Sequence, residues 1–456
     1  MLIKREIFRA YDIRGVVDRD FDEAWVEVLG KACGTFFLKR GQRQAVVGHD
    51  CRHSSPGYQA AMIKGLLSTG VDVLYINMVP TPLFYYAVKK FNRQAGVMIT
   101  ASHNPPEFNG FKVWSGAGTI HSADVREVYE IMASGEFNIG QGIASQHDVV
   151  PAYLEELSAQ VRLPAPVRVV VDGGNGAGGA ICAELLRRVG AEVVELYCDP
   201  DGNFPNHHPD PTRDENNADL RAKVLEVKAQ VGIGLDGDAD RIGALDEKGT
   251  MIYGDRLLAI FSRQVLQDRP GATVIGEVKC SHLMFQDIAE HGGKPIMGQT
   301  GHSLIKARMQ ETGAVLAGEM SGHMFFADRY YGFDDALYAA LRLVEIIGKN
   351  PAKPLSTYLD EWPPIFSTPE IRMDCPEEIK FQIVERAQAF FRERFNVVDV
   401  DGVRIVFPDG WGLLRASNTQ PILVLRFEAE SEARLKEVRA LVEEPLGLWI
   451  GELARG

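Results

Sequence analysis

The stretch that decides the fold is Val231-Gly-Ile-Gly-Leu-Asp-Gly-Asp-Ala-Asp-Arg241, in which a short apolar segment runs into a loop with three aspartates. We expect the apolar part, Val231–Leu235, to be a buried strand. Upstream of it, alternating strand and helix patterns occupy Arg168–Val171, Gly178–Val189, Val193–Leu196 and Ala218–Lys228. Strands that alternate with helices predict a parallel sheet covered on both faces, with sites at the carboxyl ends of its strands.

The same alternation of strand and helix patterns occurs in the sequence before and after this region. The earlier occurrence has strand or helix patterns at Ala45–Val47, Ser54–Thr69, Val71–Ile76, Pro82–Phe91 and Gly96–Thr100. The later occurrence has them at Thr273–Val278, His282–His291, Pro295–Met297, His302–Glu311 and Ala314–Ala317. The last part of the chain differs: Val403–Phe407 and Leu413–Leu414 predict a β-meander, and a helix is expected near Glu430–Glu443, which together indicate a small α+β domain.

Composition narrows the functional classes. With 456 residues, the chain is long enough for about three domains at roughly 150 residues each. Hydrophobic residues make up 45% and charged residues 24%, which is typical of a globular protein, and the net charge of −13 disfavours general binding to nucleic acid or anionic membranes. The six cysteines show no CxxC spacing, and no stretch is apolar enough for a signal core or a membrane span. We therefore expect a soluble cytoplasmic protein.

The aspartate loop is the first candidate site. Asp236, Asp238 and Asp240 occupy every second position, so their carboxylates can converge on a hard cation. A site with three carboxylates and few other protein ligands is typical of Mg²⁺. A solvated acidic turn is one alternative. A calcium-binding EF-hand loop is another, because Glu247 stands at its twelfth position, but its sixth position requires glycine and here holds Arg241.

A second loop, Thr100–Pro105, follows the predicted strand Gly96–Ile99. Ser102, exposed on such a turn between small residues, could act as a nucleophile or phosphate acceptor; the alternative is a serine that only caps a turn. His103 is adjacent in sequence, which predicts poor geometry for activating Ser102 as in a hydrolase triad. Lys112 follows ten residues later, within reach for acid–base chemistry.

Two further loops carry groups suited to a phosphorylated sugar. Arg415–Pro421 combines a guanidinium, hydroxyls and an amide, which are donors for a phosphate dianion. In Gly318–His323, Glu319 and Ser321 are two residues apart and suit vicinal sugar hydroxyls. Ordinary polar turns explain either loop taken alone. His302 begins a predicted helix with a side chain that titrates near neutrality, and Lys279 follows a predicted strand.

The segment Gly174–Gly179 contains a complete G-x-G-x-x-G pattern between a predicted strand and helix. Glu195 follows Gly176 by nineteen residues, near the position of the ribose-binding acid in dinucleotide folds. An NAD-dependent oxidoreductase is therefore an alternative function. A tight turn with close helix–strand packing explains the glycines equally well, and the oxidoreductase hypothesis leaves the other loops without a role.

Taken together, the serine, aspartate, Glu319 and Arg415 loops closely resemble those of the α-D-phosphohexomutase family. The resemblance extends to Arg9-Ala10-Tyr11-Asp12-Ile13-Arg14-Gly15 and covers essentially the whole chain. It implies three similar mixed α/β sandwich domains plus a C-terminal α+β domain around a central cleft, four domains rather than three. We expect their bounds at residues 1–148, 149–250, 251–366 and 367–456.

The resemblance also implies a role for individual residues. Ser102 would carry the phosphoryl group, Arg241 would lie beside it, and Lys112 and His302 would be the acid and base. The implied magnesium ligands are Asp236, Asp238, Asp240 and a phosphoserine oxygen of Ser102. The implied substrate ligands are Tyr11, Arg14, Lys279, Glu319, Ser321, His323, Arg415, Ser417, Asn418 and Thr419.

The function implied is interconversion of hexose 1-phosphate and hexose 6-phosphate, with mannose or glucose as the sugar, through a phosphoserine enzyme and a 1,6-bisphosphosugar. One Mg²⁺ per chain and glucose 1,6-bisphosphate as activator would accompany it, in a monomer or homodimer with no nucleic-acid or membrane partner. Gly318–His323 resembles the phosphomannomutase/phosphoglucomutase branch; the phosphoglucosamine mutase branch more often has Gln at the position of Met320, and stays an alternative. A non-catalytic protein that binds a metal or a sugar phosphate is the third hypothesis.

Overall fold

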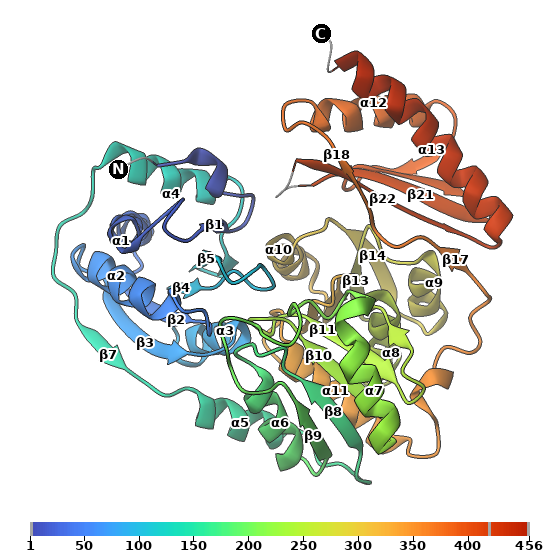
Figure 1. The fold of residues 1–456 in the computed structure, drawn as a ribbon, viewed down its shortest axis with the longest axis horizontal. Coiled ribbons are helices and arrows are strands. Elements are labelled where there is room, and N and C mark those ends of the chain that lie inside the picture. The colour runs from blue at the N-terminus through green and yellow to red at the C-terminus, as the bar shows by residue number, and fades with distance from the viewer. Residues whose placement is uncertain (1–2, 418–420, 454–456) are drawn as a thin grey trace.

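The computed structural model describes residues 3–417 and 421–453, which form four β-sheets with their helices (Figure 1). The first sheet comes from residues 13–146. In spatial order its strands are β1 (Ile13–Val16), β5 (Phe108–Ser115), β4 (Ala95–Ile99), β2 (Gln44–His49), β3 (Asp72–Met78) and β7 (Ala144–Gln146), with β6 (Gly118–Thr119) paired to β5. The helices of this region are α1 (Glu23–Lys39), α2 (Ser55–Leu67), α3 (Thr81–Lys90) and α4 (Ala123–Ser134), after a 3₁₀ turn η1 (Arg5–Ile7).

The second and third sheets follow the same plan. The second has the strand order β12 (Met251–Ile252), β11 (Ile242–Asp246), β10 (Val231–Leu235), β8 (Arg168–Asp172), β9 (Glu192–Leu196). The third has the order β14 (Lys294–Gly298), β13 (Thr273–Glu277), β15 (Leu316–Gly318), β16 (Met324–Phe326). Their helices are α5 (Val150–Ser158), α6 (Gly179–Arg188), α7 (Ala218–Val227), α8 (Gly254–Asp268), α9 (His282–Glu290), α10 (His302–Thr312) and α11 (Ala336–Lys349), with 3₁₀ turns η2 (Asp214–Asn217) and η3 (Leu355–Thr357).

One arrangement of strands recurs in these three sheets. Three parallel strands are followed in the chain by an antiparallel strand: β5 after β4, β11 after β10, and β16 after β15. The turn between the last parallel strand and its antiparallel partner carries, in order, the Ser102, Asp236–Arg241 and Glu319 loops. The expected parallel strands are present within a few residues of their predicted bounds, but the strand rhythm alone did not predict the antiparallel ones. The three similar mixed α/β domains implied by the resemblance are confirmed.

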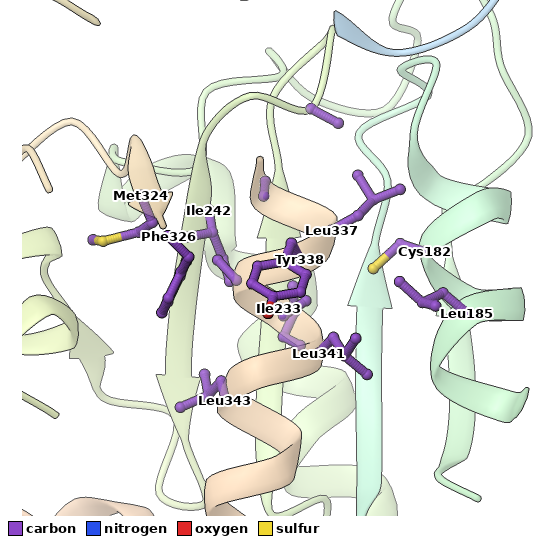
Figure 2. Packing of buried hydrophobic residues seen from close by; sticks show 14 of the residues in the cluster. Cys182, Leu185, Ile233, Ile242, Met324, Phe326, Leu337, Tyr338, Leu341 and Leu343 are labelled. Atoms are coloured by element: carbon purple, nitrogen blue, oxygen red, sulfur yellow. The ribbon is translucent and has the colours of Figure 1, made fainter. Parts of the chain in front are cut away.

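A largely buried helix joins the second and third sheets. One cluster of buried apolar side chains draws on the first three sheets, from Val46 to Tyr358 in sequence. Every residue of α11 from Ala336 to Gly348 is buried. Figure 2 shows Leu337 and Leu341 of this helix on the side that faces α6, and Tyr338 packs edge-on against Phe326, with ring centroids 5.4 Å apart. Because one helix serves both sheets, burial fixes their relative position.

The C-terminal part has a different fold and its own core. Its antiparallel sheet has the order β17 (Phe366–Ser367), β22 (Ile422–Ala429), β21 (Gly410–Ala416), β20 (Val403–Phe407), β19 (Asn396–Val398), and β18 (Ile371–Asp374) also pairs with β22. The helices α12 (Lys380–Arg392) and α13 (Glu432–Leu453) cover this sheet (Figure 1, orange to red). A small apolar cluster of Val278, Trp411 and Leu413 links it to the third sheet. The expected α+β domain is confirmed, although β22 and the full length of α13 were not predicted.

Candidate active site

The aspartate loop is a buried turn between β10 and β11. Asp236, Asp238 and Asp240 have no measurable exposure, and one carboxylate oxygen of each lies within 4.8 Å of the others. Burial, together with the charges of Asp240 and Asp238, raises the pKa of Asp236 well above its usual range. Within the described chain, Oδ1 of Asp238 is buried without a hydrogen-bond partner, and Oδ1 of Asp240 has only a contact with His323 at 3.3 Å. Converging, under-compensated carboxylate oxygens are a donor set that fits Mg²⁺.

Ser102 lies against this cage rather than on an exposed turn. Its side chain is buried, and Oγ donates a hydrogen bond to Oδ2 of Asp236 at 2.6 Å. The expectation of an exposed serine is therefore wrong, because the aspartate loop of the next domain covers it. The prediction for His103 is also wrong: its Nδ1 lies 3.1 Å from Ser102 Oγ. The left-handed backbone of Ser102, with φ at 50°, accompanies this unusual contact between neighbours.

Lys112 lies in β5, where it pairs directly with Met98 of the antiparallel neighbour β4. Its Nζ donates to Oδ2 of Asp238 at 2.8 Å and also contacts Oδ2 of Asp240. Burial would lower the pKa of Lys112, but the two carboxylates outweigh it and raise that pKa. The antiparallel strand thus places an ammonium group inside the aspartate cage.

The Glu319 loop adjoins the aspartate loop. Backbone pairing between Arg241 and His323 joins them. His323 lies 2.7 Å from Glu319 Oε2 through Nδ1 and 3.3 Å from Asp240 Oδ1 through Nε2, and Ser321 Oγ is 3.1 Å from Nδ1. Burial would lower the pKa of His323, but Asp240 outweighs it and the value rises to about 9. His323 is therefore an imidazolium between two loops.

His302 begins α10, as expected, in a different setting. Its Nδ1 lies 3.2 Å from Nζ of Lys306, which donates to Asp334 Oδ1 at 2.7 Å. Burial and the Lys306 charge lower the pKa of His302, so the ring is neutral at pH 7. It stacks on His323 with ring centroids 5.5 Å apart and meets the edge of Tyr11 at 5.2 Å.

The remaining predicted residues lie around these groups. Arg14 donates to Asn104 in the serine loop at 2.7 Å, so the N-terminal motif meets that loop. Lys279 pairs with Glu370 at 3.0 Å, and Arg415 pairs with Asp401 at 2.9 Å. Burial would lower the pKa of Arg415, but the charge of Asp401 contributes to raising it, and the pKa lies above its usual value. Ser417 is buried at the end of β21, whereas Asn418 and Thr419 lie outside the described residues.

The glycine pattern at Gly174–Gly179 has a structural explanation. A Cβ at Gly176 would lie 2.7 Å from the carbonyl oxygen of Gly237, and one at Gly178 would collide with the side chain of Ala239. Both contacts are with the aspartate loop. The glycines allow the backbone of one turn to pack on the other, which is the close-packing interpretation of the motif.

Several residues at the site carry no local sequence signal. Thr81 at the start of α3 donates to Asp238 Oδ2 at 2.6 Å, and Arg52 after β2 contacts the serine loop. Lys306 and Asp334 form the pair behind His302. Each acts across a long sequence separation, so only a pairing signal between distant positions could have found them.

Comparisons with known proteins agree with this geometry. The models of phosphoglucomutase/phosphomannomutase alpha/beta/alpha domains I, II and III match residues 5–139, 151–249 and 253–365, and the C-terminal domain model matches residues 370–444. A phosphomannomutase/phosphoglucomutase of Pseudomonas aeruginosa is 44% identical over 442 residues, covering 96% of this chain and 95% of the relative. A phosphoglucomutase of Neisseria gonorrhoeae is 43% identical over 444 residues, covering 96% of each.

The solved structures give the same result. A phosphoglucomutase/phosphomannomutase family protein from Burkholderia thailandensis superposes with a TM-score of 0.91 at 40% identity, covering 98% of this chain and 97% of the other. Fold and site thus define an enzyme of the phosphohexomutase class. The chain belongs to the phosphoglucomutase/phosphomannomutase family. Four domain models match where length alone suggested three, and the NAD-dependent oxidoreductase alternative receives no support. Among the described residues, no helix is long and apolar enough to cross a membrane.

Proposed function

We propose that this enzyme interconverts hexose 1-phosphates and hexose 6-phosphates through a phosphorylated Ser102 and a 1,6-bisphosphosugar. The observation that carries the proposal is the contact between Ser102 Oγ and Asp236 at 2.6 Å, inside a cage of three buried aspartates. A serine that only capped a turn would need no such cage.

In the first step, the sugar oxygen forms a bond to phosphorus, the bond from phosphorus to Ser102 Oγ breaks, and the proton of the sugar hydroxyl passes to a base. After the bisphosphate has turned around, its other phosphoryl group returns to Ser102 and the sugar oxygen regains a proton. Asp236, Asp238 and Asp240, with an oxygen of phosphorylated Ser102, would hold one Mg²⁺, which supplies positive charge beside the transferring group. Arg241, next to Asp236 and Asp240, adds a fixed positive charge.

Two groups flank the cage and are placed for proton transfer. Lys112 contacts Asp238 and Asp240, and His323 lies 3.3 Å from Asp240. His302 has no hydrogen bond or ion pair with the three aspartates among the described residues. We therefore propose Lys112 and His323 as the proton-transfer pair; because contact with the aspartates raises the pKa of both groups, each has to release its proton before it can act as the base. His302, an acid/base candidate together with Lys112 in the sequence, is instead assigned to the substrate side of His323, on which it stacks.

The other loops would hold the sugar and its second phosphate. Glu319 and Ser321 suit sugar hydroxyls, and Arg415, Ser417, Asn418 and Thr419 suit the phosphate that is not being transferred. Tyr11, Arg14 and Lys279 complete the set. We propose the domain bounds 1–148, 149–250, 251–366 and 367–456, so that Tyr11 and Arg14 come from the first domain, Lys279 and the Glu319 loop from the third, and the Arg415 loop from the fourth.

We propose mannose or glucose phosphates as substrates, because relatives more than 40% identical are named phosphomannomutase/phosphoglucomutase or phosphoglucomutase. Glucose 1,6-bisphosphate is the proposed activator, since it can phosphorylate Ser102. A cytoplasmic monomer or homodimer that needs no nucleic acid or membrane is consistent with these substrates.

A coupled assay tests the proposal. Mannose, glucose and glucosamine 1-phosphates are supplied separately, with and without Mg²⁺ and glucose 1,6-bisphosphate, and formation of the 6-phosphate is followed. We expect turnover of mannose or glucose phosphate that requires Mg²⁺ and rises with the bisphosphate. Preferred turnover of glucosamine phosphate would favour the phosphoglucosamine mutase alternative, and no turnover of any of the three would refute the proposed function.

A further inference from the structure

Arg52 is a buried arginine in the turn after β2, and its side chain contacts the serine loop. Its Nη1 donates to the carbonyl oxygens of Pro105 at 2.6 Å and Phe108 at 2.9 Å. Its Nη2 donates to the carbonyl oxygens of Ser102 at 2.8 Å and Asn104 at 2.6 Å. One guanidinium therefore binds four backbone carbonyls along the whole loop, including that of Ser102 itself.

The guanidinium is itself held in place. Its Nε donates to Asp50 Oδ2 at 3.1 Å, and Asp50 Oδ1 accepts from Arg52 N at 3.0 Å and from Ser55 Oγ at 2.6 Å. Asn109, at the start of β5, donates to Ser55 Oγ at 3.0 Å. The chain of contacts thus runs from the turn after β2, through Ser55 at the start of α2, to β5, so the Arg52 side chain is held from several elements.

The loop needs such support because its central residue is strained. Ser102 has φ at 50°, a conformation that costs a non-glycine residue of order 1 kcal/mol or more and persists only when its surroundings impose it. The backbone N–H of Ser102 donates to Thr100 Oγ1 at 2.9 Å. Its carbonyl oxygen accepts from Arg52, so the peptide groups before and after Ser102 are fixed by different partners.

We propose that Arg52 is the positioning residue for the phosphoryl carrier: it holds Ser102 where its Oγ meets Asp236 and where a phosphoryl group on it is kept from water. This inference rests on the proposed function of Ser102. The planar fork of arginine presents five N–H donors in fixed directions, and lysine has three donors on one atom. A lysine at position 52 would keep the charge near Asp50 but could not bridge four carbonyls spread along the loop.

Two consequences follow when the bridge is lost. Transfer slows, since a displacement of about 1 Å at a reacting group can cost about a hundredfold in rate. The phosphoserine also becomes accessible to hydrolysis, in which water forms a bond to phosphorus, the bond to Ser102 Oγ breaks, and Oγ takes up a proton as inorganic phosphate leaves. Sugar binding changes less than turnover, because most of the residues proposed to hold the sugar and its second phosphate lie in other domains; Tyr11 and Arg14 of the first domain are the exceptions, and Arg14 contacts Asn104 of the serine loop.

Arg52→Lys tests this in the full-length enzyme, with Arg342→Lys as control. Arg342 is equally buried but pairs with Asp328, far from the loop in sequence and without contact to it. For Arg52→Lys we expect kcat to fall about a hundredfold with KM within about threefold. Intact-mass analysis should show faster loss of the phosphoryl group from Ser102, and hydrogen exchange should rise in residues 100–110. Arg342→Lys should lower stability without these changes.

The outcomes separate this inference from the proposed function. If wild-type Ser102 is phosphorylated and active but Arg52→Lys behaves like the Arg342 control, the positioning role of Arg52 is wrong and the function stands. If wild-type Ser102 never carries phosphate in the presence of glucose 1,6-bisphosphate, the proposed function itself fails. Should Arg52→Lys not fold, Ser55→Ala serves as the second variant. It removes one hydrogen bond to Asp50, and a smaller loss of kcat with faster phosphoserine hydrolysis is expected; unchanged kcat and hydrolysis would overturn the inference.

Discussion

Different kinds of contact hold the Arg415 loop and the transfer centre, by which we mean the Ser102, Asp236–Arg241 and Glu319 loops. One apolar cluster runs through all three domains that form the transfer centre, and α11 serves two of their sheets, although each of these domains also has an apolar cluster of its own. The domain of Arg415 has a separate core and meets the third sheet through a small apolar patch and a polar cluster. In that cluster, Arg404 donates to the carbonyls of Val278 and Cys280, and Glu428 accepts from His282 and Trp411.

The difference matches the two tasks. Phosphoryl transfer depends on fixed geometry, which a continuous apolar core provides. A phosphate-binding loop has to accept the substrate from either end, so it benefits from an interface that can adjust, and polar interfaces between domains are the kind that do. Trp411 and Arg404 connect the two regions at Lys279, whose neighbours Val278 and Cys280 they contact. The comparison predicts that substitutions at the transfer centre cause large losses of turnover, and that substitutions in the C-terminal domain cause smaller, graded losses.

Replacing the phosphoryl carrier should have the largest effect. Ser102→Ala removes the oxygen that bonds to phosphorus, and we expect turnover to fall by roughly 10³-fold or more, as for other covalent nucleophiles. The coupled assay measures this, and unfolding curves that match the wild type serve as control. Turnover near the wild-type value, with contaminating mutase excluded, would contradict a covalent mechanism.

A substitution in the aspartate cage should have the next largest effect. Asp238→Asn replaces an anionic oxygen by a neutral amide, so Mg²⁺ affinity should fall at least about tenfold, with activity partly restored at high Mg²⁺. Calorimetric titration with Mg²⁺ alone measures binding without turnover. Thr81→Val is the matched comparison, because it removes only the hydrogen bond to Asp238 Oδ2, and its effect should be smaller. Equal metal binding in Asp238→Asn and wild type would remove this residue from the site.

The two histidines test which one takes part in proton transfer. His323→Gln should lower kcat about 10²-fold or more, the usual contribution of a general acid or base. His302→Gln should mainly raise KM, because we assign that ring to the substrate side of His323 and, within the described residues, it has no hydrogen bond or ion pair with Asp236, Asp238 or Asp240. Steady-state kinetics of both variants decide this. A larger loss of kcat in His302→Gln would restore the assignment made from sequence.

Substitution in the Arg415 loop should have a smaller effect, and it should weaken the binding of 1-phosphate and 6-phosphate sugars alike. Arg415→Ala removes a charge-assisted contact worth about 1.5–3 kcal/mol, or roughly ten- to a hundredfold in affinity. Both 1-phosphate and 6-phosphate sugars should bind more weakly, and the need for added bisphosphate should rise as the intermediate escapes. Inhibition constants of the two isomers give the answer. Loss for one isomer only would argue against a shared pocket.

Much of the site could be predicted because its chemistry is concentrated in contiguous loops. The spacing of Asp236, Asp238 and Asp240 predicts that their carboxylates converge, which the structure shows, and the polar groups of the Glu319 and Arg415 loops also lie within a few residues of one another in sequence. The sequence could not show what surrounds each loop. Ser102 was expected to be exposed and is buried, since a loop more than a hundred residues away covers it.

The same limit applies to the fold. Alternating strands and helices predicted the parallel strands, but β5 and its Lys112 were assigned to no strand, because a strand that is buried on both faces has no distinctive period. Arg52, Thr81 and Lys306 look like ordinary surface or helix residues in sequence. Their importance comes from carbonyl and carboxylate partners that only the folded chain supplies.

The smallest effect on turnover is expected at the interface between the third and fourth domains. Burial would raise the pKa of Glu428, but the hydrogen bond from His282 and the charge of Arg426 lower it to about 2. A depressed carboxyl pKa stabilises the fold above the unfolded value near 4.5, and this contribution is lost as pH falls toward 2. A shift of that size corresponds to about 3 kcal/mol at pH 7.

Glu428→Gln keeps an acceptor for Trp411 but removes the charge, so we expect about 1–3 kcal/mol lower stability at pH 7 and less than about tenfold lower turnover. The difference from wild type should stay constant between pH 7 and 5 and shrink below pH 4, where the wild-type carboxyl loses its advantage. Urea unfolding followed by tryptophan fluorescence measures it, with the exposed Glu444→Gln of α13 as control. A pH-independent difference would mean that shape rather than charge holds this interface, and the contrast between a rigid centre and an adjustable phosphate domain would then need another cause.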